Sequence, residues 1–434
     1  MRASRTAMRV LLVTWYFPPY NDVGALRTGA LAQYLANGGH EVQVLTAARA
    51  AADGSLSIPI AFDRITRTSW FDVDTWSFQP RGNARDPNSR VAQGKAHYSK
   101  IKSALGLHYR NLVRLPDRQI GWLPYLLQAG GSVLENGRFD LIFASGPPFT
   151  TFLGARALAR RFSLPWFAEY RDAWSDDVYG TRPAWRRSVD RMMENQTLSS
   201  ARGIVAVSQR WAEHFGKRFG KPAVAIYNGF DEFMVSSRTG RSASMPLRIT
   251  YSGVLYEGKR DPSCLYQAIK LAGLTPEEVE VSYYGPAPED VLPLAGKFGV
   301  ADFVRVCDRV PHSQSLAIQR ESDVLLLLQP GIDEANVPAK FFEYLAARRP
   351  ILGLGLDSGV PAEIIRDRRA GLYVTEPAKV AAQLRLWVDQ KQQEGQIPDL
   401  PESVGAGLSR SDQFASLMTF LKSALSDSEA TLER

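Results

Sequence analysis

The chain has 434 residues, of which 45% are hydrophobic and 22% charged, an ordinary globular composition that is long enough for two domains. It has no apolar run near the roughly 20 residues of a membrane-spanning helix, only two cysteines and five unclustered histidines, so we expect a cytoplasmic protein without a disulfide framework or a metal site. The net charge of +7 comes from residues 1–240, and such a basic half is typical of proteins that meet a membrane surface, a phosphorylated substrate or a nucleic acid.

Residues 8–17 form a continuous apolar run that ends at Pro18, which is typical of a buried parallel strand followed by a loop. Arginines before this run give it some likeness to a secretory signal, but the run is short and lacks a cleavage site of small residues. Apolar residues then recur at helical spacing as far as Gly38, and residues 41–46 have the pattern of a second strand. Strand, helix and strand together predict a βαβ unit.

The same pattern continues through the first half of the chain. Further strands are expected at residues 141–144, 165–168 and 203–207. Residues 74–102 are polar and predict a mobile loop. Residues 231–246 contain Ser, Gly and Arg without periodicity and predict an interdomain linker.

Two sets of arginines in this half recur at helical spacing, so that each set could line one face of a helix. They are Arg156, Arg160 and Arg161, and Arg182, Arg186, Arg187 and Arg191. Ordinary solvated helix faces are one interpretation. No nucleic-acid motif or interleaved aromatic residues accompany them, so we expect no nucleic-acid partner. We favour an anionic membrane surface or an anionic lipid acceptor.

A second alternating series begins at residue 247 and predicts another α/β domain of the same plan. Its expected strands are residues 247–251, 279–284, 304–306, 324–328 and 351–354, and its expected helices are residues 262–272, 313–320 and 339–347. The predicted domains are residues 1–230 and 247–405, followed by a helical segment and polar tail at 406–434. Two open parallel α/β domains place a ligand crevice at the carboxyl ends of their strands.

The loop after the first strand of the second domain carries a pair of cations. Lys259 and Arg260 follow Gly253 between a strand and a helix, where a lysine point charge and an arginine fork could bind a diphosphate. An exposed loop with solvated charges is the alternative interpretation.

Residues 333–343 lead into another helix of this domain and form a third candidate. Peptide nitrogens near Val337 are expected to face the crevice, and Lys340 adds a cation. Glu343 lies one turn into the helix, where its carboxylate can accept hydrogen bonds from both hydroxyls of a ribose. For Glu343, a charge interaction with the start of the helix is the alternative.

The first domain has two candidate positions at strand ends. Gly24 lies where the backbone can approach a ligand and where a helix N-terminus favours negative charge, although a tight turn explains it equally well. Residues 169–174 combine acidic, basic and aromatic side chains, with Asp172 as the polar candidate and an internal ion pair of Arg171 as the alternative. Residues 145–148 are expected to shape the crevice wall.

These segments occur in an order that resembles the retaining GT-B-fold glycosyltransferases of the family 4 type, from bacterial envelope polysaccharide pathways. The resemblance covers nearly the whole length of the chain. It rests on PDRQIGWLP at 116–124, SGPPFTTFLGARALA at 145–159, PWFAEYRDAWSD at 165–176, IVAVSQRWAEHF at 204–215, YNGFD at 227–231, YSGVLYEGKRDP at 251–262 and VPAKFFEYLAARRPILGL at 337–354, and on the apolar start at 11–46.

The resemblance implies two Rossmann-like, doubly wound parallel-sheet domains that face a central cleft. It implies a UDP- or GDP-sugar donor, held mainly by the second domain, with Lys259 and Arg260 on the diphosphate and Glu343 on the ribose. Gly24 would approach the donor phosphates, the acceptor would bind the first domain, and the C-terminal helix would cross back onto that domain. Retention would proceed by front-face displacement, in which the leaving diphosphate helps to take the acceptor proton, and Asp172 would orient the acceptor.

Three departures from the family pattern affect what can be expected of the site. Ala335 stands where the first Glu of the Glu-x7-Glu motif is usual, although Glu334 is adjacent. Val254 follows Gly253 where many relatives have Arg, and residues 143–148 lack the usual His. A sugar-nucleotide 2-epimerase would need a set of ionisable side chains around the sugar, and the sequence shows none. The main alternative to a glycosyltransferase is therefore a non-catalytic scaffold of the same fold.

Overall fold

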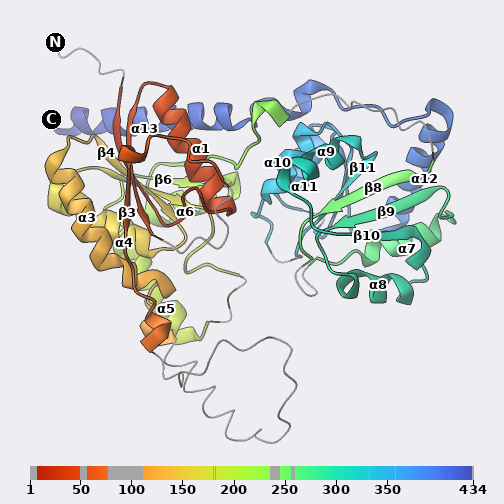
Figure 1. Cartoon of the computed structure of the whole chain (residues 1–434), viewed down its shortest axis with the longest axis horizontal. Helices are drawn as coiled ribbons and strands as arrows, with labels where there is room; N and C mark the ends of the chain where they lie inside the picture. Colours follow the sequence, from red (N-terminus) through yellow and green to blue (C-terminus); the bar gives the residue numbers. More distant parts are fainter. Residues whose placement is uncertain are drawn as a thin grey trace, which may run out of the picture. The chain divides into compact units, whose positions relative to one another are not determined.

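The computed structural model describes residues 7–48, 56–76, 111–178, 180, 182–234, 245–255, 260–331, 333–356 and 358–432. The chain divides into two compact units (Figure 1). The first unit comprises Met1–Val207, Trp211–Ala225 and Leu417–Arg434, and the second comprises Ser208–Arg210 and Ile226–Ser416. Most of the predicted loop, part of the predicted linker at 235–244, and Lys259 lie outside the described residues.

The described part of the first unit contains a seven-stranded parallel sheet in the order β3-β2-β1-β4-β5-β6-β7. Its strands are β1 (Arg9–Thr14), β2 (Glu41–Ala47), β3 (Ile65–Thr68), β4 (Leu141–Gly146), β5 (Trp166–Tyr170), β6 (Gly203–Ala206) and β7 (Ala223–Ala225). The strand order reverses between β1 and β4, which pair directly from Val10↔Leu141 to Thr14↔Ser145. In open α/β sheets, ligands bind outside the carboxyl ends of the strands at such a point.

Helices cover this sheet because the strands are apolar on both faces. They are α1 (Val23–Asn37), α3 (Leu123–Asn136), α4 (Thr150–Phe162), α5 (Ala184–Leu198) and α6 (Gln209–Phe219). Leu11, Leu12 and Val13 are fully buried, as expected for a parallel strand that is covered on both sides. All the predicted strands of this half are confirmed, with bounds that differ by a few residues.

The described part of the second unit contains a six-stranded parallel sheet in the order β10-β9-β8-β11-β12-β13. Its strands are β8 (Leu247–Ser252), β9 (Val279–Tyr284), β10 (Val304–Cys307), β11 (Val324–Leu328), β12 (Ile351–Leu354) and β13 (Gly371–Tyr373). Its helices are α7 (Ser263–Leu271), α8 (Pro288–Lys297), α9 (His312–Glu321), α10 (Ala339–Ala346), α11 (Val360–Asp367) and α12 (Pro377–Glu394). α8, α11, α12 and β13 were not predicted from the sequence.

The long helix α13 (Arg410–Leu432) lies within residues 406–434, where a helical segment and polar tail were expected. From Leu417 onward this helix belongs to the first unit. There Arg202 Nε donates to the carbonyl oxygen of Ala424 at 2.7 Å, and the rings of Phe167 and Phe420 lie 6.1 Å apart. Of the helices that the structure describes, none is long and apolar enough to cross a membrane.

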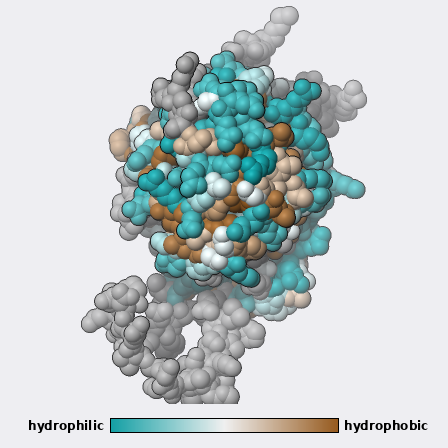
Figure 2. Space-filling view, turned by 90° about the vertical axis from the view of Figure 1, so that its right-hand side faces the viewer, coloured by the Kyte–Doolittle hydropathy of each residue, from teal (hydrophilic) through white to brown (hydrophobic). Residues whose placement is uncertain are grey.

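The second unit also exposes single apolar side chains, among them Leu271 on α7 and Leu386 on α12. Figure 2 looks onto this unit and shows hydrophobic side chains interspersed with hydrophilic ones. Scattered exposure of this kind is normal for a globular protein.

Candidate active site

Four of the predicted donor residues meet at the carboxyl end of β8. Gly253 follows this strand directly, Arg260 lies a few residues further on, and Lys340 and Glu343 lie in the first turns of α10. β8 is paired with β11, the strand that precedes α10, so the chain brings both loops to the same edge of the sheet. The side chain of Val337 is only 3% exposed and packs in an apolar cluster, so it contributes to the core.

Lys340 occupies the centre of this group. Its Nζ donates a hydrogen bond to the carbonyl oxygen of Ser252 at 2.9 Å and lies 3.9 Å from the centroid of the Tyr251 ring. Desolvation, reinforced by the charge of Arg260, lowers the pKa of Lys340 well below its ordinary value. An anion bound here would favour the protonated ammonium.

The conformation of Gly253 explains why glycine is required at this position. Its φ is +121°, which other residues rarely adopt, and a Cβ there would lie 3.2 Å from Lys340 Nζ. The next residue, Val254, is 50% exposed. The Lys340 ammonium therefore lies beside Gly253, the residue before Val254, where the resemblance led us to expect an arginine.

Arg260 contacts the same turn. Its Nη1 donates to the carbonyl oxygen of Val254 at 2.8 Å and lies 3.4 Å from the Tyr251 hydroxyl. Arg260 and Lys340 therefore share Tyr251 as a neighbour, and two positive charges converge on one turn of the backbone.

Glu343 is held by two side chains of α9. Its Oε1 lies 2.9 Å from His312 Nε2, and its Oε2 accepts a hydrogen bond from Gln319 Nε2 at 3.2 Å. Burial alone would raise the pKa of Glu343, but the hydrogen bond and charge of His312 and the Gln319 amide hold it below its ordinary value. The hydrogen bond with Glu343 in turn raises the pKa of His312.

Sequence reasoning missed both His312 and Gln319. They are seven residues apart on α9, which puts them on the same side of the helix two turns apart. Gln319 is 1% exposed and also lies 3.3 Å from the Ser252 hydroxyl, so it connects α9, α10 and the end of β8. Their contacts with Glu343 depend on how α9 packs against α10, so the sequence offered no local signal for either residue.

Glu334, the residue next to Ala335, is engaged elsewhere in the second unit. One carboxylate oxygen accepts a hydrogen bond from Ser358 at 2.6 Å, and the other forms an ion pair with Arg210. These contacts lower the pKa of the Glu334 carboxyl, the bond from Ser358 having the largest effect.

In the first unit, Gly24 and Arg171 meet at the carboxyl ends of β1 and β5. Asp22 caps α1 by accepting a hydrogen bond from the Gly24 amide at 2.7 Å. A Cβ at Gly24 would lie only 1.6 Å from Arg171 Nη1, so glycine makes room for this guanidinium. Arg171 also donates to the Pro147 carbonyl oxygen and lies 5.2 Å above the Tyr16 ring, and burial lowers its pKa.

The ion pair expected near Arg171 is formed by a different arginine. Glu169 is fully buried and pairs with Arg27 at 2.9 Å, while its second oxygen accepts a hydrogen bond from the Ser145 hydroxyl at 2.5 Å. Among the described residues no carboxylate lies within ion-pair distance of Arg171, although the charges of Glu169 and Asp172 act on it. Asp172 follows Arg171 and is exposed.

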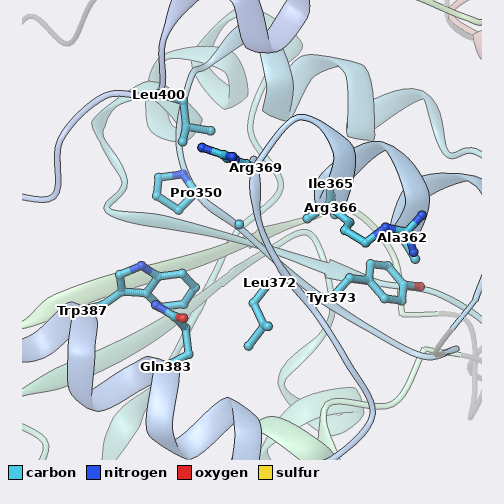
Figure 3. Close-up of a pocket in the computed structure, with 11 residues that line it drawn as sticks. Pro350, Ala362, Ile365, Arg366, Arg369, Leu372, Tyr373, Gln383, Trp387 and Leu400 are labelled. Atoms are coloured by element: carbon cyan, nitrogen blue, oxygen red, sulfur yellow. The ribbon is translucent and has the colours of Figure 1, made fainter.

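A cavity of about 460 Å³ in the second unit lies apart from these residues. α11, β13 and α12 form most of its lining, and Figure 3 shows Trp387, Leu372 and Tyr373 around the hollow. None of the predicted donor residues that the structure describes lines it. Within the described ranges, no group of three or more His, Cys, Asp or Glu side chains is placed to hold a metal ion.

Residues 24–229 match the Glycosyl transferase 4-like domain. No curated protein matches the sequence. The fold is similar to that of Anabaena HepE in complex with UDP, with a TM-score of 0.62 at 14% identity over 96% of this chain and 100% of that one.

Two other solved structures are similar over nearly the whole chain. Sucrose-phosphate synthase from Thermosynechococcus elongatus has a TM-score of 0.60 at 13% identity, with 98% of each chain covered. The pneumococcal O-GlcNAc transferase GtfA, in complex with UDP and GlcNAc, has a TM-score of 0.58 at 11% identity, with 96% of this chain and 99% of that chain covered. The expected GT-B fold of two parallel-sheet α/β domains is confirmed, and the domain match confirms the expectation of a glycosyltransferase.

Proposed function

We propose that this glycosyltransferase transfers a sugar from a UDP-sugar to a saccharide or lipid-linked acceptor, with retention, in the synthesis of a bacterial cell-surface polysaccharide. The observation that carries the proposal is the group formed by Lys340, Arg260 and Glu343 around the end of β8. A nucleoside diphosphate offers the complementary features, namely two phosphates and a ribose with two hydroxyls. UDP is preferred to GDP because UDP is the nucleotide bound in HepE and in GtfA.

The contacts of Glu343 suit it to bind a ribose. An ionised carboxylate offers about four lone-pair positions, and His312 and Gln319 engage one oxygen each. The remaining positions can accept hydrogen bonds from two neighbouring hydroxyls. His312 and Gln319 would therefore fix the orientation of the carboxylate before the donor arrives.

The cations of the second unit would bind the donor diphosphate. Lys340 and Arg260 both contact Tyr251, and Lys259 precedes Arg260 in the sequence. Lys340 would supply the positive charge that the family pattern places at residue 254, where this chain has valine. As the sugar leaves, negative charge grows on the diphosphate, and fixed cations at that point stabilise the transition state more than the ground state.

In the proposed step, the bond between the anomeric carbon and the diphosphate oxygen breaks while the acceptor oxygen bonds to the same face of that carbon. The acceptor proton passes to the departing diphosphate, so no protein base has to remove it. We assign the acceptor to residues 1–230 and the donor to residues 247–405. Asp172, exposed after β5, would orient the acceptor hydroxyl.

The excess of basic residues in the first half supports an acceptor at an anionic surface. Positive charge draws a protein to the anionic cytoplasmic leaflet of a membrane. We therefore infer that the enzyme works at the cytoplasmic face of the membrane on a lipid-linked saccharide.

The proposal is tested by turnover. The purified chain is incubated with UDP-glucose, UDP-galactose or UDP-N-acetylglucosamine and a membrane lipid extract, and released UDP is measured. The anomeric configuration of the product is then read by proton NMR. An α-linked product from an α-linked donor supports the proposal, whereas a β-linked product contradicts retention, and absence of turnover with every nucleotide sugar contradicts the activity.

A further inference from the structure

The cavity of the second unit lies beside the last strand of its sheet. β13 pairs with β12 and ends the strand order, so its other side has no strand neighbour among the described residues. Leu372 packs against the apolar cluster that includes α12, and Tyr373 packs against the cluster that includes α10 and α11. Because both residues line the cavity, it opens where the two apolar clusters of the unit meet around the edge of the sheet.

The walls of this cavity are largely apolar. Ile365 and Trp387 are buried, and Leu372 and Leu400 are half-buried. Its volume of about 460 Å³ lies within the range of small-molecule pockets, which have mostly apolar walls and a few polar groups that fix the orientation of the ligand. The cavity therefore has the size and the lining to hold the apolar body of a small molecule.

Three polar side chains in the lining have no hydrogen-bond partner among the residues that the structure describes. They are the indole N–H of Trp387, the amide of Gln383 and the guanidinium of Arg369. A buried indole N–H usually has an acceptor, as that of Trp122 has in the Thr68 hydroxyl at 2.6 Å. All three groups can donate, so a ligand that offers acceptor oxygens would complete them.

The charge of the lining has one sign. Arg366 lines the cavity together with Arg369, and the described lining residues include no Asp or Glu. Arg366 does pair with its neighbour Asp367 at 3.1 Å, but both side chains are exposed and such pairs contribute little. Figure 3 shows Arg369 and Arg366 among the side chains that surround the hollow, so apolar walls and positive charge occur together.

We propose that this cavity is a second ligand site, which takes a small organic anion with an apolar ring or short hydrocarbon body and one carboxylate, phosphate or sulfonate group. Ile365, Leu372 and Trp387 would enclose the body. Arg366 and Arg369 would bind the anionic group through charge-assisted hydrogen bonds. The site is separate from the group around the end of β8, so it goes beyond the proposed transfer reaction.

A small anion fits this cavity better than an extended peptide added to the edge of the sheet. β13 has only three residues, Gly371–Tyr373, so it offers few main-chain hydrogen bonds to an added strand. Very short edge strands are one of the ways in which proteins prevent such pairing. A small anion uses the arginines and the unengaged N–H groups instead, and it needs no long edge.

The test is a fluorescence titration of the full chain with 8-anilinonaphthalene-1-sulfonate, which joins an apolar ring system to one anionic group. N-phenyl-1-naphthylamine has the same rings without the sulfonate and is the neutral probe. Gln383→Trp puts a bulky side chain into the cavity wall, and Gln392→Trp makes the same change at an exposed position of the same helix, α12. Thermal unfolding checks that every variant is folded.

A second pair of variants tests the charge. Arg366→Gln/Arg369→Gln removes the two cations of the cavity at exposed positions, where the substitution leaves the core intact. Lys297→Gln/Arg305→Gln removes two exposed cations elsewhere in the same unit and is the matched control. Each titration is repeated with excess UDP, and UDP binding is measured separately by calorimetry, so failure of the donor site is seen apart from failure of the cavity site.

Gln383→Trp should weaken the binding of both probes by at least about tenfold, because it fills the space that they share. The arginine variant should weaken the sulfonate probe by about tenfold and leave the neutral probe unchanged. Both controls and excess UDP should have no effect. A wild-type chain that does not bind the sulfonate probe, a cavity variant that binds it like wild type, a control that loses as much binding, or displacement of the probe by UDP would each overturn the proposal.

Discussion

Replacement of Lys340 by methionine should weaken UDP binding without destabilising the protein. The ammonium donates to a carbonyl oxygen 2.9 Å away and lies over the Tyr251 ring, and the charge of Glu343 offsets only part of the penalty from its desolvation and from the charge of Arg260. A hydrogen bond between charged groups contributes about 1.5–3 kcal/mol, so loss of the contact with the diphosphate should weaken UDP binding about ten- to hundredfold. Methionine keeps the apolar length of the side chain and removes the charge.

Although Lys340→Met should weaken UDP binding, it should leave the free energy of unfolding unchanged or raise it. Because the pKa of Lys340 is lower in the folded chain than in the unfolded chain, the charged ammonium destabilises the fold at pH values below the folded pKa. This penalty disappears as the pH rises toward the ordinary lysine pKa. At neutral pH, Lys340→Met should therefore be at least as stable as wild type, as is typical of residues kept for function.

Isothermal titration calorimetry with UDP and UMP, together with urea unfolding, measures both effects. Lys297→Met, at the exposed end of α8, is the matched control and should leave both unchanged. The loss should be smaller for UMP, which lacks the second phosphate. A UDP dissociation constant within about twofold of wild type, or a clear loss of stability in Lys340→Met, would refute the reasoning.

Three other substitutions test the roles of Gly24, His312 and Glu343. Gly24→Ala should displace Arg171, whose Nη1 lies 1.6 Å from the new Cβ, and lower turnover; wild-type turnover would show that this contact is unimportant. His312→Gln should remove a pH dependence from urea unfolding, since the raised pKa of His312 stabilises the fold below the ordinary histidine pKa and this contribution is lost as the pH rises through the raised value. If the free energy of unfolding of His312→Gln varied with pH as steeply as that of wild type, a stabilising pair of His312 with Glu343 would be excluded. Glu343→Gln should weaken UDP and uridine alike, by about tenfold, and calorimetry showing unchanged uridine binding would contradict a ribose contact.

The strands were predictable because parallel strands are buried on both faces and therefore read as apolar runs. Val324–Leu328 is fully buried, as its five apolar residues indicate. β13 has only three residues, two of them partly exposed, so it gives no such run. α12 was a different case, because Val380, Leu384 and Trp387 recur at helical spacing and could have been recognised.

The site was predictable where its residues lie at strand ends or helix starts. Gly253, Arg260, Lys340 and Glu343 meet because β8 and β11 are neighbours in the sheet. The pairing of His312 with Glu343 depends on how α9 packs against α10, which no local pattern encodes.

The inward and outward sides of α5 were not predictable for a similar reason. Helical spacing groups Arg182, Arg186, Arg187 and Arg191, but it does not show which side of the helix meets the unit. The buried acids Asp190 and Glu194 decide this, since they draw arginines inward.

The central claim is a nucleoside diphosphate site in the second unit, and ligand-dependent thermal unfolding tests it most directly. The full chain is heated with UDP, GDP, ADP, dTDP or CMP, first without added metal and then with Mg²⁺. The account predicts that UDP raises the midpoint without metal and that the rise grows with UDP concentration, because a ligand that binds only the folded state stabilises it. A midpoint that none of the nucleotides shifts would contradict the claim.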